Sequence, residues 1–222
     1  MHKFAASILS ADFANLGDDV SKVLAAGVDS IHFDVMDMHY VPNLSVGPLV
    51  CKSLRAAGVS AMIDVHLMVT DPQKYIVPFA EAGADLLSFH PETVTDVYKT
   101  VCDIKMAGMQ AGLVFNPDQP VQITEEVLVK IDMVLLMSVV PGFGGQSFIP
   151  AVLDKVALTR QFLDKHGSGA MLAVDGGIKV DNVASVAKAG AEYFVVGSGL
   201  FSADDYGVRM MALRNQLNKA SL

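Results

Sequence analysis

Apolar and polar positions along the chain form two patterns, stretches with helical periodicity and short apolar runs of strand length. The same junction between them recurs: a helical pattern stops at a glycine, and an apolar run begins within about three residues. Glycine suits this place because it adopts the left-handed conformation that commonly ends a helix. The junctions are AAGVDSIHFD at 25–34, AAGVSAMIDVH at 56–66, EAGADLLSFH at 81–90, MAGMQAGLVF at 106–115 and KAGAEYFVVG at 188–197.

These junctions predict strands that alternate with helices along the whole chain. Runs such as MVLLM and YFVV are apolar at every position, which is typical of parallel strands covered by helices. We therefore predict an α/β fold, a (β/α)8 TIM barrel formed by residues 1–222 as a single domain, in preference to an open doubly wound sheet. The strands are predicted near 4–9, 28–34, 60–67, 84–89, 109–115, 131–138, 170–175 and 191–197.

Composition and charge exclude several classes of function. With 222 residues and 52% hydrophobic content, the chain is long enough to bury one large core. Its net charge of -8 argues against nucleic acid and anionic membrane surfaces as partners, because both attract basic proteins. A small anionic ligand is still compatible with this charge if backbone N–H groups bind it.

The chain carries no pattern that predicts export or a membrane span. The apolar run in MHKFAASILSAD is too short for a secretory signal, and Asp12 follows it at once. No run approaches the roughly 18 uninterrupted apolar residues of a membrane span. Cys51 and Cys102 fall in segments with helical periodicity, far apart in sequence, so we expect no disulfide. These features predict a cytoplasmic protein.

Polar side chains in the predicted strands gather at the carboxyl ends. Ser7 lies near the end of the first strand, His32 and Asp34 end the second, His66 ends the third and Asp175 ends the seventh. In a barrel these ends meet at one mouth, where active sites of this fold are built. Two imidazoles and two carboxylates suit one divalent cation, Zn, Fe(II), Mn or Co rather than Ca or Mg. Taken singly, each histidine could instead be a hydrogen-bonded core residue, and each aspartate a capping group.

Asp64 lies two residues before His66 and therefore shares its face of the predicted strand. Its carboxylate could orient the His66 imidazole from behind, as carboxylates commonly do for metal-binding histidines. The alternative is a hydrogen bond within the strand layer.

Glycine clusters follow the last three predicted strands: PGFGGQ at 141–146, DGG at 175–177 and VGSG at 196–199. Glycine lets the backbone approach a ligand closely, and phosphate sites of barrels are commonly built from these last loops. The clusters therefore predict a phosphate site formed by backbone N–H groups. Three methionines at strand ends could form an apolar cap that excludes water, or could fill the core: Met36, Met68 and Met137.

A series of motifs resembles the ribulose-phosphate 3-epimerase family. The similarity runs from about residue 4 to the last helix and includes the specific pair HFDVMD and PGFGGQ. Ala6 and Met38 depart from the family, which often has Pro and Gly at these places. The motifs are, in order, SILSADFANLG, HFDVMD followed by HYVPN, DVHLMV, FHPE, GLVFNP, LLMSVVPGFGGQ, VDGG and VGSG.

The resemblance implies a barrel of the ribulose-phosphate-binding type and a role for each matching residue. It implies one divalent metal ion bound by His32, Asp34, His66 and Asp175, with Asp34 and Asp175 as the catalytic acid and base. It also implies that Ser7, His66 and Asp175 contact the substrate, and that Met36, Met68 and Met137 cap the site. The residues that it implies for the phosphate site are Gly142, Phe143, Gly144, Gly145, Gly176, Gly177, Gly197 and Ser198.

The activity that the resemblance implies is epimerisation at C3, which interconverts D-ribulose 5-phosphate and D-xylulose 5-phosphate in the pentose phosphate pathway. Two bases would move the proton through an enediolate, with no nucleotide or redox cofactor. We also expect a homo-oligomer, either a dimer or a hexamer. The sequence leaves open epimerisation of a hexulose 6-phosphate, a decarboxylase or lyase of the same fold, and a sugar-phosphate binding protein without catalysis.

Overall fold

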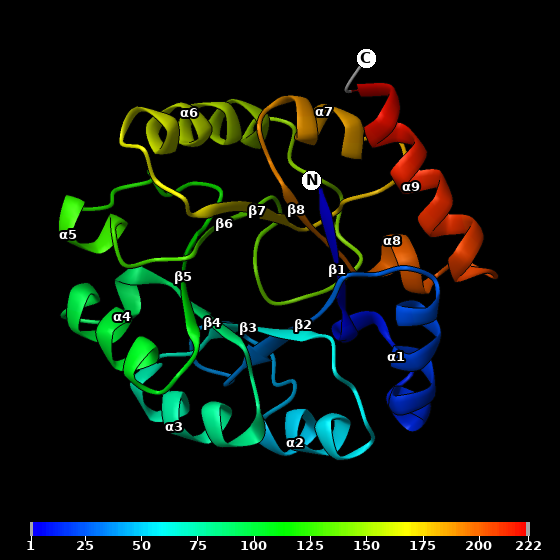
Figure 1. The fold of residues 1–222 in the computed structure, drawn as a ribbon, viewed down its shortest axis with the longest axis horizontal. Helices are drawn as coiled ribbons and strands as arrows, with labels where there is room; N and C mark the ends of the chain where they lie inside the picture. Colours follow the sequence, from blue (N-terminus) through cyan, green and yellow to red (C-terminus); the bar gives the residue numbers. More distant parts are fainter. Residues whose placement is uncertain (1, 221–222) are drawn as a thin grey trace.

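The computed structural model describes residues 2–220, and within them eight parallel strands close into a barrel in the order β1 to β8. Strand β1 pairs with both β2 and β8, which closes the ring. Figure 1 shows the helices forming a ring outside the strands. The predicted (β/α)8 barrel is therefore confirmed. The strands are β1 (Lys3–Ser7), β2 (Ser30–Met36), β3 (Met62–Met68), β4 (Leu86–Phe89), β5 (Gln110–Phe115), β6 (Met133–Met137), β7 (Met171–Asp175) and β8 (Tyr193–Val196).

The helices fill the connections between strands, and their ends carry recognisable capping residues. Pro48 begins one helix, and the Asp96 side chain accepts a hydrogen bond from the Lys99 amide at the start of another. The helical elements are η1 (Ile8–Ser10), η2 (Phe13–Asn15), α1 (Leu16–Ala25), α2 (Pro48–Ala56), α3 (Gln73–Ala82), η3 (Pro91–Thr93), α4 (Val97–Met106), α5 (Glu125–Leu128), α6 (Val152–Lys165), α7 (Val183–Lys188), α8 (Ser198–Phe201) and α9 (Tyr206–Ala220).

Alternation along β2 explains how a fully buried strand carries a histidine and an aspartate. Ile31, Phe33 and Val35 belong to the apolar layer between the strands and the helices. His32 and Asp34 lie on the opposite face of the strand and therefore point into the barrel. The rest of the interior is filled by a second apolar cluster that includes Leu86, Val114, Met133, Leu135, Ala173 and Tyr193.

Acidic side chains fix the amino-terminal ends of several strands. The Asp29 carboxylate accepts a hydrogen bond from the Phe4 amide at 2.7 Å, and Asp85 does the same for Ile63 at 2.7 Å. Asp132 accepts from the Ala111 amide at 2.8 Å. Each aspartate thus reaches across to the preceding strand. The carboxylates are in turn paired with Arg214, Arg55 and Lys105, respectively.

The glycines of the recurring junctions adopt the predicted left-handed conformation. Their φ angles are 93° at Gly27, 93° at Gly58, 90° at Gly83, 89° at Gly108 and 114° at Gly190. A residue with a Cβ atom is strained there, because Cβ approaches the following carbonyl oxygen. The junction glycines therefore turn each helix back toward the barrel.

Other predictions about the chain can be compared with the structure at this level. Cys51 lies in α2 and Cys102 in α4, and both are free thiols, as the sequence predicts. Within the described part of the chain, no helix combines the length and the apolar character that a bilayer span requires. Met38, one of the two departures from the family, has a positive φ of 64°, which explains why glycine is common at that place.

Replacing Gly58 by alanine tests the role of the junction glycines. A Cβ atom at Gly58 would meet nothing within 4 Å, so the cost comes from the left-handed backbone alone. We expect Gly58→Ala to lower the free energy of unfolding by about 1–2 kcal/mol in urea denaturation. Gly17→Ala is the matched control: it adds the same methyl group in open space within α1, where alanine favours the helix. Equal effects of the two substitutions would contradict the assignment.

Candidate metal centre and active site

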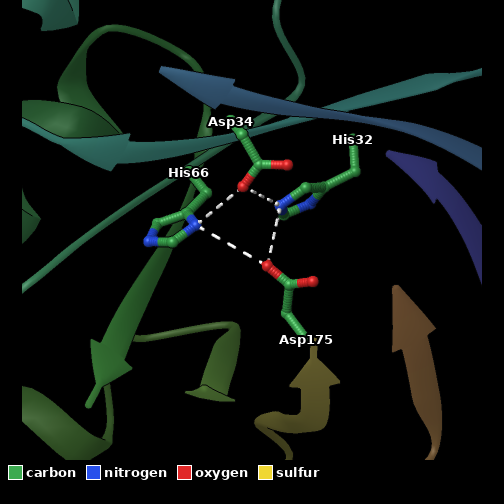
Figure 2. A group of neighbouring side chains, drawn as sticks. All are labelled: His32, Asp34, His66 and Asp175. Atoms are coloured by element: carbon green, nitrogen blue, oxygen red, sulfur yellow. Dashed lines mark hydrogen bonds and ion pairs between the residues drawn. The ribbon is translucent and has the colours of Figure 1, made fainter. Parts of the chain in front are cut away.

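Residues from β2, β3 and β7 converge at the carboxyl end of the barrel. His32, Asp34, His66 and Asp175 each offer one nitrogen or oxygen atom, and these atoms lie within 4.8 Å of one another. Figure 2 shows the side chains pointing toward a common centre. The register of β2 and β3 sets Asp34 directly beside His66. The structure therefore brings together the predicted ligands, which the sequence separates by up to about 140 residues.

The spacing of these atoms fits a single divalent cation. His66 Nδ1 lies 3.3 Å from Asp34 Oδ1 and 3.9 Å from Asp175 Oδ2. His32 Nε2 lies 3.5 Å and 3.7 Å from the same oxygens. Ligand atoms about 2.1 Å from a tetrahedral zinc ion would be about 3.4 Å apart, close to these values. The donor set of imidazoles and carboxylates suits Zn, Fe(II), Mn or Co.

The hydrogen bonding of the two His32 ring nitrogens gives a second test of whether the site fits a cation. Among residues 2–220, buried His32 Nε2 has no hydrogen-bond partner, although such atoms are nearly always satisfied. Its other nitrogen, Nδ1, lies 2.7 Å from Asp64 Oδ2. If Nδ1–H donates to this carboxylate, Nε2 carries a lone pair toward the cluster. This orientation of His32 fits that of a metal ligand.

Asp64 contacts a different histidine from the one that the sequence pattern suggested. The sequence left two possibilities open, orientation of His66 on the same strand or a hydrogen bond within the strand layer, and the carboxylate faces His32 across the β2–β3 pair. Tyr193 Oη also donates to Asp64 Oδ2 at 3.2 Å, and Ser30 Oγ lies 2.7 Å from Tyr193 Oη. Register, rather than spacing along one strand, decided the partner.

Burial and mutual charge shift the pKa values of the cluster in different directions. Burial raises the pKa of Asp34, but the His32 and His66 imidazoles outweigh burial and hold this pKa well below its usual value. Burial and the adjacent Asp34 charge raise the pKa of Asp175 to about 8. Burial lowers the pKa of His66. A divalent cation among these groups would favour the ionised form of both carboxylates.

Asp34 is held in place by hydroxyl groups as well as by the histidines. Ser7 Oγ donates to Asp34 Oδ2 at 2.6 Å, which leaves Oδ1 facing the two imidazoles. Ser45 Oγ donates to the Asp34 backbone carbonyl and accepts a hydrogen bond from the Met36 amide at 3.0 Å. The carboxylate therefore has a defined direction before any ligand arrives.

A cavity above the cluster is lined by the remaining residues predicted for the site. Ser7, Asp34 and Asp175 form its polar floor, while His32 and His66 are fully buried beneath it. The three methionines, each at most 3% exposed, also line it: Met36, Met68 and Met137. The glycine loops complete the lining with Gly142, Phe143, Gly144, Gly145, Gly176, Gly177, Gly197 and Ser198.

Two of these glycines are required by close packing. Gly176 and Gly177 have φ angles of 114° and 65°. A Cβ atom on Gly177 would lie 2.4 Å from the Phe148 backbone nitrogen, and one on Gly176 would lie 2.5 Å from Val139 Cγ2. The loop after β7 therefore passes too close to its neighbours to carry side chains, as the glycine cluster predicted.

The structure adds two residues to which the sequence assigned no task. His90 Nε2 lies 2.9 Å from His66 Nε2, and both side chains are fully buried. Glu92 follows at the start of η3 and lies 3.6 Å from His90 Nδ1. Both belong to the motif FHPE, so a signal was present in the sequence. It could not reveal the contact, because His66 belongs to another strand.

Fold and site together define a class: a (β/α)8 barrel with a histidine and aspartate centre that can bind a divalent metal ion, beside glycine-rich loops. Comparison with known proteins then specifies the family. Residues 3–201 match the ribulose-phosphate 3 epimerase family. The chain belongs to this family of enzymes.

Curated relatives agree with this membership. The chain is 56% identical to ribulose-phosphate 3-epimerase of Serratia marcescens over 93% of this chain and 99% of that protein. It is 53% identical to the enzyme of the same name from Escherichia coli K12, over 98% and 96%.

Two solved structures resemble the fold at low identity. One is 3-hexulose-6-phosphate synthase from Salmonella typhimurium, with a TM-score of 0.69, 20% identity, and coverage of 98% of this chain and 99% of that one. The other is KGPDC from Streptococcus mutans, with a TM-score of 0.68, 13% identity, and coverage of 99% of each chain. At these identities the likeness supports the fold alone.

Removal of a carboxylate tests the metal centre. A cation at about 100 times its Kd should stabilise the fold by about 2.7 kcal/mol, seen as a higher midpoint of thermal unfolding in Co²⁺ or Mn²⁺. We expect Asp175→Asn to lose most of this shift, because a neutral amide replaces one of the two charged carboxylate ligands. Glu81→Gln, which neutralises an exposed carboxylate on α3, should keep the full shift. A wild-type midpoint that no divalent cation moves would contradict the assignment.

Proposed function

We propose that the chain epimerises C3 of a ketopentose phosphate and thereby interconverts D-ribulose 5-phosphate and D-xylulose 5-phosphate. Family membership gives the activity, since relatives over 50% identical across nearly the whole chain carry the name ribulose-phosphate 3-epimerase. One observation in the structure supports it above the others. The carboxylates of Asp34 and Asp175 approach the same centre from β2 and β7, on opposite sides in Figure 2, and both line the cavity.

Inversion at C3 needs a proton removed from one face and a proton delivered to the other. A single base could return the proton only to the face from which it came. Asp34 and Asp175 lie on either side of the centre, so a planar enediolate between them would have a carboxyl group at each face. In our proposal Asp34 takes the proton from D-ribulose 5-phosphate and protonated Asp175 delivers one. The reverse reaction exchanges the two roles.

The same residues would hold the metal ion. His32 Nε2, His66 Nδ1 and one oxygen each of Asp34 and Asp175 would bind a single Zn, Fe(II), Mn or Co ion. When bound, the ion would supply positive charge that stabilises the negative charge developing on the substrate oxygens. The chain's own part is to orient the ligands through Ser7 and Asp64. This chemistry requires no nucleotide or redox cofactor.

The glycine loops would bind the phosphate group. The loops after β6, β7 and β8 line the cavity, and their glycines carry no side chains of their own that could cover the backbone N–H groups. Such groups bind phosphate without a lysine or arginine, which suits a chain with a net charge of -8. Met36, Met68 and Met137 would cover the reacting carbon with apolar surface and limit access of water.

The remaining parts of the proposal concern the environment of the enzyme. We place it in the cytoplasm, where its free thiols at Cys51 and Cys102 would stay reduced. We also propose a homo-oligomer, either a dimer or a hexamer. Exposed apolar side chains on the helices, such as Leu49, Val77 and Leu158, are compatible with association.

Substitution of each proposed base tests the mechanism. We expect Asp34→Asn and Asp175→Asn to lower kcat by about 10²-fold to 10⁴-fold, since each removes one of two proton-transfer groups. In heavy water the wild-type enzyme should incorporate deuterium at C3 with no loss of carbon, measured by NMR. A lyase or decarboxylase would instead break a carbon–carbon bond of the substrate. Wild-type rates in either variant would refute the assignment of two bases.

A methyl group in the glycine loops tests the phosphate site. A Cβ atom on Gly197 would point at Ser10 Oγ, 2.8 Å away, within the cavity lining. We expect Gly197→Ala to raise KM for D-ribulose 5-phosphate by about 10-fold to 100-fold, with a smaller effect on thermal stability. Gly169→Ala, which adds a methyl group in open space outside the lining, should leave KM unchanged. Equal KM values for the two variants would contradict this location of the phosphate.

A further inference from the structure

The ring of His66 has contacts on two opposite sides. Its Nδ1 faces the carboxylates of Asp34 and Asp175, at 3.3 and 3.9 Å. Its Nε2 lies 2.9 Å from Nε2 of His90, which is itself fully buried at the end of β4. The two imidazole rings are tilted by 39°, with centroids 5.1 Å apart. His90 thus contacts a proposed metal ligand from behind without belonging to the metal centre.

The hydrogen positions along this contact follow from the role of His66. A neutral imidazole that binds a cation through Nδ1 carries its hydrogen on Nε2. That hydrogen can be donated to His90 only if His90 Nε2 carries a lone pair. His90 must then carry its own hydrogen on Nδ1, which is buried and has no hydrogen-bond partner within residues 2–220. The nearest acidic group, Glu92 Oε1, lies 3.6 Å from this Nδ1.

Side chains from two other loops at the carboxyl end of the barrel hold Glu92 in place. Tyr40 Oη, from the connection after β2, donates to Glu92 Oε1 at 2.7 Å. Asn116 Nδ2, which follows β5, donates to the same oxygen at 3.0 Å and to Tyr40 Oη at 2.7 Å. The Tyr40 ring also packs against His90, with centroids 4.8 Å apart. The Glu92 carboxylate therefore has a defined position near His90 Nδ1.

We propose that His90 is a positioning residue that accepts the Nε2 hydrogen of His66, with Glu92 behind it, and so presents His66 Nδ1 to the divalent metal ion. The two histidines of the centre are then oriented by different means. His32 is backed directly by the Asp64 carboxylate at 2.7 Å, whereas a neutral imidazole stands between His66 and the carboxylate of Glu92. Partners of this kind commonly change metal affinity about 10-fold to 100-fold.

The proposal rests on the metal centre of the proposed function, and binding of Co²⁺ to the wild-type protein separates the two. Affinity is measured by competition with a chelator, and ligand geometry by the visible absorption of the bound Co²⁺. A wild-type protein that binds no Co²⁺ would overturn the metal centre itself. If the wild-type protein binds Co²⁺ and substitution of His90 leaves the affinity unchanged, only the positioning role would be overturned.

Two amide substitutions make a matched pair. The side-chain amide of Gln can place an acceptor near the position of His90 Nε2, whereas the shorter Asn side chain reaches only the position of Nδ1. We expect His90→Asn to weaken Co²⁺ binding by about 10-fold to 100-fold and to change the Co²⁺ spectrum. His90→Gln should restore affinity to within about threefold of wild type and should restore the spectrum. Equal Co²⁺ affinities in the two folded variants would overturn the proposal.

A second substitution keeps the test decisive if His90→Asn does not fold. Glu92 is partly exposed, and Glu92→Gln keeps an oxygen that can accept from Tyr40 and Asn116 while removing the charge. We expect it to weaken Co²⁺ binding about threefold to tenfold, and unchanged affinity would overturn the role of Glu92. Thr159→Val is the control, since it deletes a buried hydroxyl on α6 that bonds the Lys155 carbonyl and should leave Co²⁺ affinity unchanged.

Discussion

Mutual repulsion among buried carboxylates is the constraint on which the site depends. Asp34, Asp64 and Asp175 lie on neighbouring or converging strands, and each is at most 8% exposed. Buried charges of one sign are unfavourable unless opposite charge or hydrogen-bond donors compensate them. Ser7 donates a hydrogen bond to Asp34, and Tyr193 and His32 face Asp64. Asp175 has no such side-chain donor among the described residues, and burial together with the Asp34 charge raises its pKa to about 8. A divalent cation among Asp34, Asp175 and the histidines would supply the missing positive charge, and the cluster could bind such an ion.

The barrel places the residues that stabilise the strand ends and the residues of the candidate site at opposite ends of its strands. At the amino-terminal ends of the strands, Asp29, Asp85 and Asp132 accept backbone hydrogen bonds and pair with basic side chains. At the carboxyl ends, polar groups converge on a cavity that methionines and glycine loops also line. Acidic residues thus hold strand ends together at one end of the barrel and form the candidate site at the other. The apolar interior between the two ends is filled by side chains such as Leu86 and Leu135.

Predictions from the pattern succeeded where the signal was local. Each predicted strand exists, but several begin about two residues later than expected; β2 is Ser30–Met36, not 28–34. The aspartate after the junction glycine stands just before the strand: the Asp29 amide donates to the Phe4 carbonyl, and the Asp29 carboxylate accepts from the Phe4 amide. The partner of Asp64, which the sequence left open between His66 and a hydrogen bond within the strand layer, is His32. Contacts between strands follow the register, which places Asp64 beside His32, and spacing along one strand does not reveal register.

The amino-acid sequence by itself determined the alternation of helices and strands, the left-handed junction glycines and the residue types at the strand ends, because these depend on short-range backbone preferences and on side-chain periodicity. It also carried the motifs of the family. Only the tertiary structure decided which groups touch: that Asp64 orients His32, that His90 lies behind His66, and that Tyr40, Glu92 and Asn116 meet at the rim. The physical reason is that hydrogen bonds and charge interactions act over a few ångströms, and closure of the barrel alone brings residues from distant strands within that range.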